Sequence, residues 1–206
     1  TPLNDRPDFF ASLDQQTEKT FQIVHVEQGG GSRSLVPTFP GLGIVHLRNF
    51  RDAGIARAHN QAIALALGRW PQDIWQERFV ALCRPEVAFD PQWLTKTLTA
   101  FQRHPDLMVA GPKILQGRAE YVGEGEWLEM SMTNQIYSLG CQLRKDRIFV
   151  FSAEGQEDER TDEEIRPTFL LNDACVVLRA SALASLQEEE RAWVDERMPA
   201  GQELFD

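Results

Sequence analysis

Apolar and polar residues follow one another along the first half of the chain in patterns typical of short strands and helices. The segments 21–26 and 44–47 are rich in β-branched and apolar residues and predict two strands. Between about 53 and 67, apolar residues recur at helical spacing, which predicts an amphipathic helix that ends at Gly68. The continuous apolar run 79–83 predicts a strand that is buried on both faces.

A second helix and another strand are predicted after this run. Asp90 and Pro91 are typical of an N-cap and a first helical position, and apolar residues follow at i, i+4 and i+7. Residues 107–112 then predict a further strand. Because strands and helices alternate at short spacing, the first half predicts βαβ units and a mostly parallel sheet flanked by helices.

The second half has a different pattern. Residues 117–166 are rich in Gly, Glu and Asp, so we expect loops and a hairpin, with a clear strand only at 148–151. The segment 169–178 returns to strand character, and an acidic helix is predicted from about 181 to 193. The acidic runs 157–159 and 188–190 are interpreted as solvated surface.

Charge and cysteine content limit the classes of function. The chain has 206 residues, enough for one domain, and a formal net charge of −10, which repels nucleic acid. Its three cysteines are far apart and odd in number, which favours a reducing cytoplasm. Neither a membrane-spanning run nor a signal peptide is recognised. We also expect the sequence to be a piece of a longer protein, truncated at both ends.

Polar groups follow three of the predicted strands. These are Glu27 and Gln28, the segment 52–60, and the segment 84–86. Ligands of open parallel sheets bind beyond the carboxyl ends of the strands, where such groups converge. Carboxylates beside arginines suit a sugar nucleotide, whose diphosphate needs cations or a metal ion.

The run 51–63 resembles the N-x-G-F-A-x-x-x-N-x-G-I segment of family-two glycosyltransferases, especially their rhamnosyltransferase-like branch. Further segments resemble motifs of that family in the same order along the chain: 26–29, 82–87, 110–115, 137–140, 173–179, 195–196 and 203–206. Each motif is short, so the resemblance depends on their order and spacing. It implies a GT-A-type α/β fold, with a Rossmann-like, mostly parallel sheet in a single domain. Residues 1–115 would form the nucleotide-sugar-binding half, and 116–206 a smaller acceptor-side half of hairpins and loops.

The resemblance also implies roles for individual residues on the donor side. Glu27 would contact the nucleobase or ribose of the donor, and the segment with Gly54, Arg57 and Asn60 would lie near the nucleotide and its phosphates. Glu86 would hold Mg²⁺ or Mn²⁺ on the diphosphate.

Two further roles concern the acceptor and the diphosphate. Asp173 would stand near the sugar or acceptor, and Glu203, or else Asp206, would act as the catalytic base. Arg84 replaces the family's asparagine, so it could either repel a metal ion or bind the diphosphate directly in a metal-sparing site.

Three functions are compatible with these residues. The first is an inverting glycosyltransferase that moves a sugar from a nucleoside-diphosphate sugar to a cell-envelope polysaccharide or glycolipid, in the cytoplasm or at the inner face of the membrane with peripheral membrane association. The second is a catalytically silent relative that binds a donor or glycan and acts with a partner, favoured by Leu204 at the base position, Arg84 and Asp173. A nucleotidyltransferase ranks lower, because no Gly-rich loop followed by Arg and Lys occurs near the start.

Overall fold

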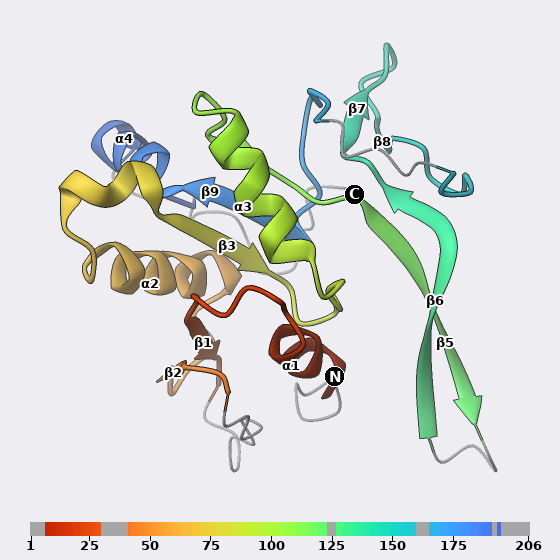
Figure 1. The fold of residues 1–206 in the computed structure, drawn as a ribbon, viewed down its shortest axis with the longest axis horizontal. Helices are drawn as coiled ribbons and strands as arrows, with labels where there is room; N and C mark the ends of the chain where they lie inside the picture. The colour runs from red at the N-terminus through yellow and green to blue at the C-terminus, as the bar shows by residue number, and fades with distance from the viewer. Residues whose placement is uncertain (1–6, 30–40, 123–126, 160–164, 191–192, 195–206) are drawn as a thin grey trace. The chain divides into compact units, whose positions relative to one another are not determined.

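The computed structural model describes residues 7–29, 41–122, 127–159, 165–190 and 193–194 (Figure 1). The chain divides into two compact units, and each is described by itself. Unit 1 comprises residues 1–110 and 177–206, and unit 2 comprises residues 111–176. Unit 2 is therefore inserted, in sequence, within unit 1. None of the described helices is long and apolar enough to cross a membrane.

Unit 1 begins with helix α1 (Pro7–Asp14), which precedes a parallel pair of strands, β1 (Ile23–Glu27) and β2 (Ile44–Arg48). Helix α2 (Ile55–Leu67) and the 3₁₀ helix η2 (Gln72–Glu77) come next. They are followed by β3 (Phe79–Cys83), α3 (Trp93–Arg103) and the two-residue β4 (Val109–Ala110). The unit is completed by β9 (Cys175–Arg179), which begins in the last two residues of unit 2, and α4 (Ala180–Glu190).

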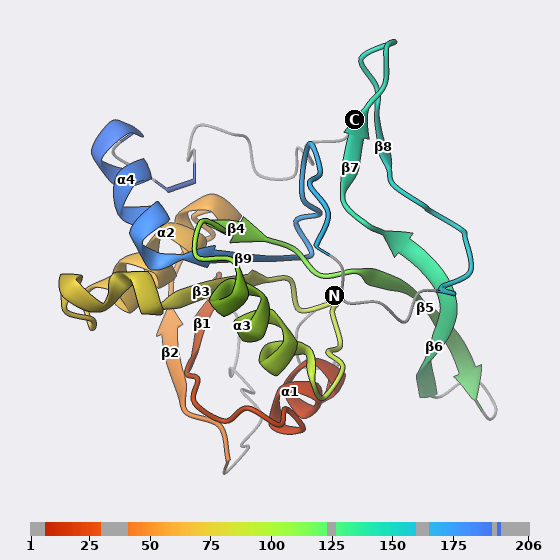
Figure 2. The same ribbon diagram turned by 45° about the horizontal axis from the view of Figure 1, so that its top comes forward.

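The predicted mostly parallel, Rossmann-like sheet of a GT-A-type fold is wrong. Among the described residues, no sheet has more than three strands. Strands β1 and β2 pair in parallel, whereas β4–β9, β5–β6 and β7–β8 pair antiparallel. The largest sheet has the order β3-β9-β4, with β9 antiparallel to β4 (Figure 2). Alternation along the sequence predicted the elements but not their pairing, because the central strand comes from residues far along the chain.

One hydrophobic core cluster of unit 1 lies between α2, β3 and α4. Ile63 and Leu67 of α2 pack with Val80, Ala180 and Leu183, and all five are buried. Three tryptophans border this cluster: Trp70, Trp75 and Trp193. Ile63 and Leu67 of the apolar face predicted for 53–67 are therefore buried, whereas Ile55 of the same face is 62% exposed. Gly68 follows the last residue of α2 as predicted.

Arg179 is a buried residue that binds several parts of this unit. It is only 6% exposed, and its guanidinium donates to the carbonyl oxygens of Leu107 and Phe101 at 3.1 Å each, and to that of Gln76. The same group lies over the rings of Phe79 and Phe101. Arg179 therefore joins η2, β3 and α3 at the end of β9.

Helix α1 was not predicted, and it contacts two other parts of unit 1. Phe10 packs edge-on against His25 of β1, and Phe9 against Phe89 in the loop before α3. The buried side chain of Gln16 donates to the carbonyl of Asp90 at 2.7 Å and accepts the N–H of Leu94 at 3.0 Å. Gln16 thus satisfies a free donor in the first turn of α3, which begins at Trp93, later than predicted.

Unit 2 consists of two antiparallel hairpins. Strands β5 (Ile114–Val122) and β6 (Trp127–Ser138) form the long one, with register shifts near Leu115. Strands β7 (Cys141–Leu143) and β8 (Phe149–Phe151) form the short one. Loops and a hairpin were predicted within 117–166, with a strand at 148–151, but the length of β5 and β6 was not predicted.

Candidate functional site

The candidate site is built on the carboxyl ends of β1 and β2. The two strands are parallel, and their last register positions pair Glu27 with Arg48. Because both strands run in the same direction, the residues that follow them, Gln28 and Asn49, also meet at this end, and α2 starts six residues later. The structure therefore brings the predicted residues of the first two loops to one edge.

Gln28 ties these segments together. Its amide oxygen accepts the N–H of Ala53 at 3.1 Å and an N–H of Asn49 at 3.3 Å, and its amide nitrogen donates to the carbonyl of Gly54 at 3.0 Å. Asp52 accepts the N–H of Gly54 at 2.9 Å. We call residues 49–54 the clasped turn, since side chains fix its backbone immediately before α2.

Asn49 adds a second connection, between the clasped turn and the body of α2. Its amide exchanges hydrogen bonds with that of Gln61, at 2.8 and 3.2 Å. Sequence reasoning placed Gln28 in a polar turn and gave Asn49 and Gln61 no role. Side-chain pairs such as these depend on register and loop path, so the local sequence contains no signal for them.

Gly54 and Arg57 form the start of α2. Gly54 is the N-cap residue with φ of 83°, a left-handed conformation that glycine adopts at low cost. No side chain of the described residues caps the helix, its first turn has no acidic residue, and Arg57 is exposed within that turn. The partial positive charge of a helix N-terminus and an arginine together favour binding of an anion.

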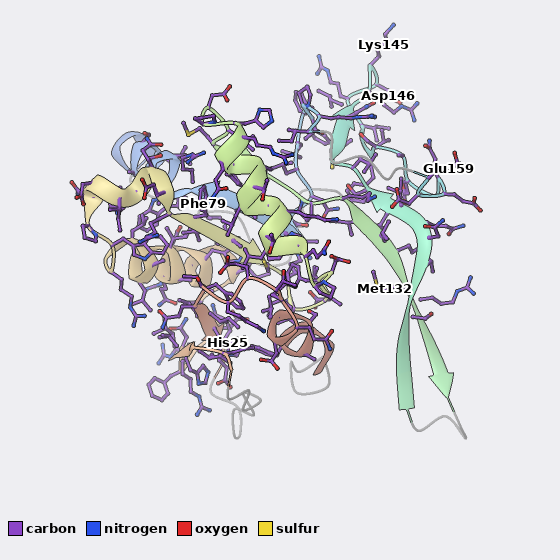
Figure 3. All side chains as sticks on the ribbon, in the orientation of Figure 1. His25, Phe79, Met132, Lys145, Asp146 and Glu159 are labelled. Carbon is purple, nitrogen blue, oxygen red and sulfur yellow. The ribbon has the colours of Figure 1, made fainter. Side chains whose placement is uncertain are left out.

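Glu27 faces other protein groups. Its Oε2 is shielded from solvent and lies 3.1 Å from Nε2 of His46 and 3.8 Å from Nε of Arg48, with no hydrogen bond of good geometry. His46 stacks on His25, with ring centroids 5.1 Å apart (His25 is labelled in Figure 3). Burial lowers the pKa of His25, and the neighbouring His46 lowers it further, whereas Glu27 opposes the shift.

Asn60 is buried and bound to the chain itself. Its Nδ2 donates to the carbonyl of Val194 at 2.9 Å, and its Oδ1 accepts the N–H of Val194 at 2.9 Å. The side chain therefore pairs with a backbone segment as a neighbouring strand would. It anchors residue 194 to α2, at a position where the resemblance implied contact with the nucleotide.

Arg84 and Glu86 lie in the turn that follows β3. The N–H of Val87 donates to the carbonyl of Arg84 at 3.4 Å, Glu86 is exposed, and Arg84 is half-buried. Helix α2 packs against both β1 and β3, so this turn belongs to the same unit as the clasped turn.

The remaining predicted residues lie elsewhere. Asp173 is exposed and belongs to unit 2, where its charge, after burial, helps to raise the pKa of the buried Cys141 thiol. Glu203 and Asp206 lie outside the described residues. Within the part of the chain that is described, no group of three or more His, Cys, Asp or Glu side chains is placed to hold a metal ion.

The candidate site is thus a clasped turn between parallel strands and a helix, with Gly54 and Arg57 at the start of the helix and the carboxylate of Glu27 close to His46 and Arg48. Comparison of the chain with protein-family models, curated proteins and solved structures found no match in any of the three.

Proposed function

We propose that this chain binds a nucleoside-diphosphate sugar at the clasped turn and transfers its sugar, with inversion, to a hydroxyl of a glycan or lipid-linked acceptor. The observation that carries the proposal is the uncapped start of α2 with the exposed Arg57 in its first turn. The diphosphate would lie against this helix end. The binding step depends on β1, β2 and α2 and needs no continuous parallel sheet.

Local charge supports an anionic ligand at this place. The whole chain has a net charge of −10, yet residues 48–57 contain three arginines and one acidic residue. Arg51 and Arg57 are exposed, whereas Arg48 lies near Glu27. A basic segment in an acidic protein concentrates phosphate groups locally, and an exposed arginine can bind two phosphate oxygens at once.

The proposed reaction is a single displacement. The acceptor oxygen forms a bond to the anomeric carbon while the bond from that carbon to the β-phosphate oxygen breaks, and the acceptor proton passes to a carboxylate, for which Glu203 or Asp206 is proposed. Charge then develops on the departing diphosphate. Arg57 and the start of α2 would stabilise that charge.

A divalent metal ion is not assigned a step. Mg²⁺ needs several oxygen ligands, and the described residues offer no group of three candidate side chains around Glu86 or elsewhere. A divalent cation would instead be held by Glu86 together with the oxygens of the diphosphate, as Mg²⁺ commonly is in proteins. Arg84, in the turn with Glu86, supports the alternative of direct contact between a cationic side chain and the diphosphate.

Calorimetric titration with uridine and thymidine diphosphate sugars tests the binding step. Arg57→Ala is expected to weaken binding about 10- to 100-fold, because a charge-assisted hydrogen bond to phosphate contributes about 1.5–3 kcal/mol. Arg103→Ala removes an exposed arginine in the last turn of α3, so it is the matched control and should leave binding unchanged. Equal affinities for wild type and Arg57→Ala would overturn the proposed site.

A catalytically silent binding protein is the second candidate, and two contacts favour it. Glu27 is already paired with His46 and Arg48, and the amide of Asn60 is bound to Val194. Sugar transfer to an acceptor, or hydrolysis of the donor, measured with and without Mn²⁺, separates the two candidates. Turnover that Glu203→Ala abolishes supports the transferase, and donor binding without turnover supports the silent protein.

A further inference from the structure

The end of the short hairpin in unit 2 exposes a group of apolar side chains. Leu143 and Phe149 are paired in register at the tip of β7–β8, and the ring of Phe169 lies 6.0 Å from that of Phe149. These side chains are 43%, 38% and 65% exposed, whereas Cys141, at the root of the same strand, is completely buried. The hairpin therefore changes from core to exposed apolar surface along its length.

A basic turn directly adjoins this apolar group. It contains Arg144, Lys145 and Arg147, and the one acidic residue, Asp146, is paired with Arg144 at 3.0 Å. Figure 3 labels Lys145 and Asp146 at the far end of the hairpin. Residues 111–176 contain 7 basic and 13 acidic side chains, so three of the seven basic ones lie in a turn of four residues. We call Leu143, residues 144–147, Phe149 and Phe169 the hairpin tip.

The backbone of the turn holds one basic residue at a conformational cost. Arg147 has φ of 65°, a left-handed conformation that favours glycine, and its N–H donates to the carbonyl of Arg144 at 2.9 Å. A glycine would fit this position with less strain. Residues in such conformations cluster at functional sites, which supports a use for the arginine side chain.

We propose that the hairpin tip docks on an anionic lipid bilayer. Leu143, Phe149 and Phe169 would enter the headgroup region, and the three basic side chains would contact lipid phosphates and carboxylates. The acidic remainder of unit 2 would be repelled by the same surface, so only the tip can approach it. This docking does not depend on the proposed sugar transfer.

The size of the patch favours a bilayer over a protein partner. A stable protein complex buries roughly 800 Å² on each partner, which usually takes about 20 residues or more. The hairpin tip offers three apolar side chains and one turn of four residues. A bilayer needs no such area, because a few inserted apolar groups together with several basic charges give measurable, salt-dependent attachment.

Co-sedimentation with vesicles tests the proposal. The protein should sediment with vesicles of phosphatidylcholine mixed with phosphatidylserine, should not sediment with phosphatidylcholine alone, and should be released by salt. Lys145→Gln should weaken binding about 5-fold, the value expected for one charge near an anionic surface. Phe169→Ser should weaken it as well. Absence of sedimentation with the anionic vesicles overturns the proposal.

Matched controls separate docking from general effects. Arg118→Gln removes an exposed charge of unit 2 outside the tip, and Met132→Ser removes an apolar side chain that is 65% exposed, the same fraction as Phe169. Both should bind vesicles as wild type does, and losses equal to those of the tip variants would contradict a specific site. Arg147→Gly removes a charge while relieving backbone strain, so its weaker binding cannot be attributed to unfolding.

Two further measurements complete the test. Light scattering should give the same molar mass for wild type and Phe169→Ser, and a self-association that this variant abolishes would show instead that the tip joins copies of the chain. Calorimetric titration with the nucleotide sugar should be unchanged in the tip variants. Vesicle binding without nucleotide binding would leave docking intact and overturn the proposed function alone.

Discussion

The clasped turn in unit 1 and the hairpin tip in unit 2 differ in whether their side chains bind the protein's own backbone or face solvent. Both are short connections that hold residues in left-handed conformations, at Gly54 and Arg147. In the clasped turn, the side chains of Gln28, Asn49 and Asp52 fix the backbone. At the hairpin tip, apolar and basic side chains point to solvent. The first arrangement preorganises a backbone for a ligand, and the second leaves side chains available for a surface.

The largest effect is expected at Arg179, a buried residue that binds several parts of unit 1. Arg179→Ala removes the partner of three backbone carbonyls from a buried site and should lower the free energy of unfolding by about 3–5 kcal/mol. Urea denaturation followed by tryptophan fluorescence measures this, since three tryptophans border the core. Arg103→Ala, at an exposed position, should change it by less than about 0.5 kcal/mol. Similar values for the two variants would contradict the bonding described.

A somewhat smaller loss is expected in unit 2 from Gly140→Ala. Gly140 has φ of 92°, and an added Cβ would lie 2.9 Å from Cβ of Thr168, whose hydroxyl is bonded to the carbonyl of Cys141. The clash and the strain together should cost roughly 2–4 kcal/mol. Gly155→Ala, with φ of 74° and nothing within 4 Å of the new Cβ, should show the strain alone, about 1 kcal/mol. Thermal unfolding of the two variants compares them, and equal shifts would exclude the clash.

Removal of the clasp should have a modest effect on stability and a clear one on binding. Gln28→Ala loses bonds to Ala53, Asn49 and Gly54 and should lower the free energy of unfolding by about 1–2 kcal/mol. Because the turn would no longer be preorganised, the affinity for the nucleotide sugar should fall as well. Gln102→Ala, exposed in α3, is the control for urea denaturation and calorimetry. Unchanged affinity in Gln28→Ala would show that the hydrogen bonds of Gln28 to the clasped turn do not contribute to ligand binding.

The smallest effect is a dependence of stability on pH. Since the folded state lowers the pKa of His25, the unfolded state binds its proton more readily. Stability is therefore retained above the ordinary histidine pKa of about 6.5 and lost as pH falls below it. His25→Phe, which keeps a ring between Phe10 and His46, should reduce this loss in urea titrations at successive pH values. His104→Gln, at an exposed position, should retain it.

Elements with strong periodicity were predicted well, and their pairing was not. The apolar spacing in 53–67 predicts α2 because Ile63 and Leu67 face the core, and the run 79–83 matches β3. The length of β5 and β6 was not predicted because Gly, Glu and Asp suggested loops, although Leu128, Met130 and Met132 alternate with polar residues. The placement of β9 between β3 and β4 depends on contacts between residues far apart in sequence, which local patterns do not encode.

The sequence predicted the location of several candidate-site residues but not their contacts, because those contacts join residues far apart in the chain. Glu27, Gly54 and Arg57 do lie at the carboxyl end of the β1–β2 pair and the start of α2. The ion pairs of Glu27, the clasp by Gln28 and the anchoring of Asn60 to Val194 depend on register and on contacts across up to 134 residues. Residue type alone therefore identified polar positions without showing which of them the fold already uses.

The order of strands in unit 1 has a consequence for synthesis of the chain. The middle strand of the β3-β9-β4 sheet comes from residues 175–179, after the whole of unit 2. During translation, β3 and β4 are therefore made well before β9, the strand that pairs with both of them. Unit 2 is made as one continuous segment between β4 and most of β9. The two hairpins of unit 2 can therefore form before β9 is made. Until then, β3 and β4 lack their shared neighbour, so we expect a chaperone that binds apolar strands to act on this earlier part of the chain.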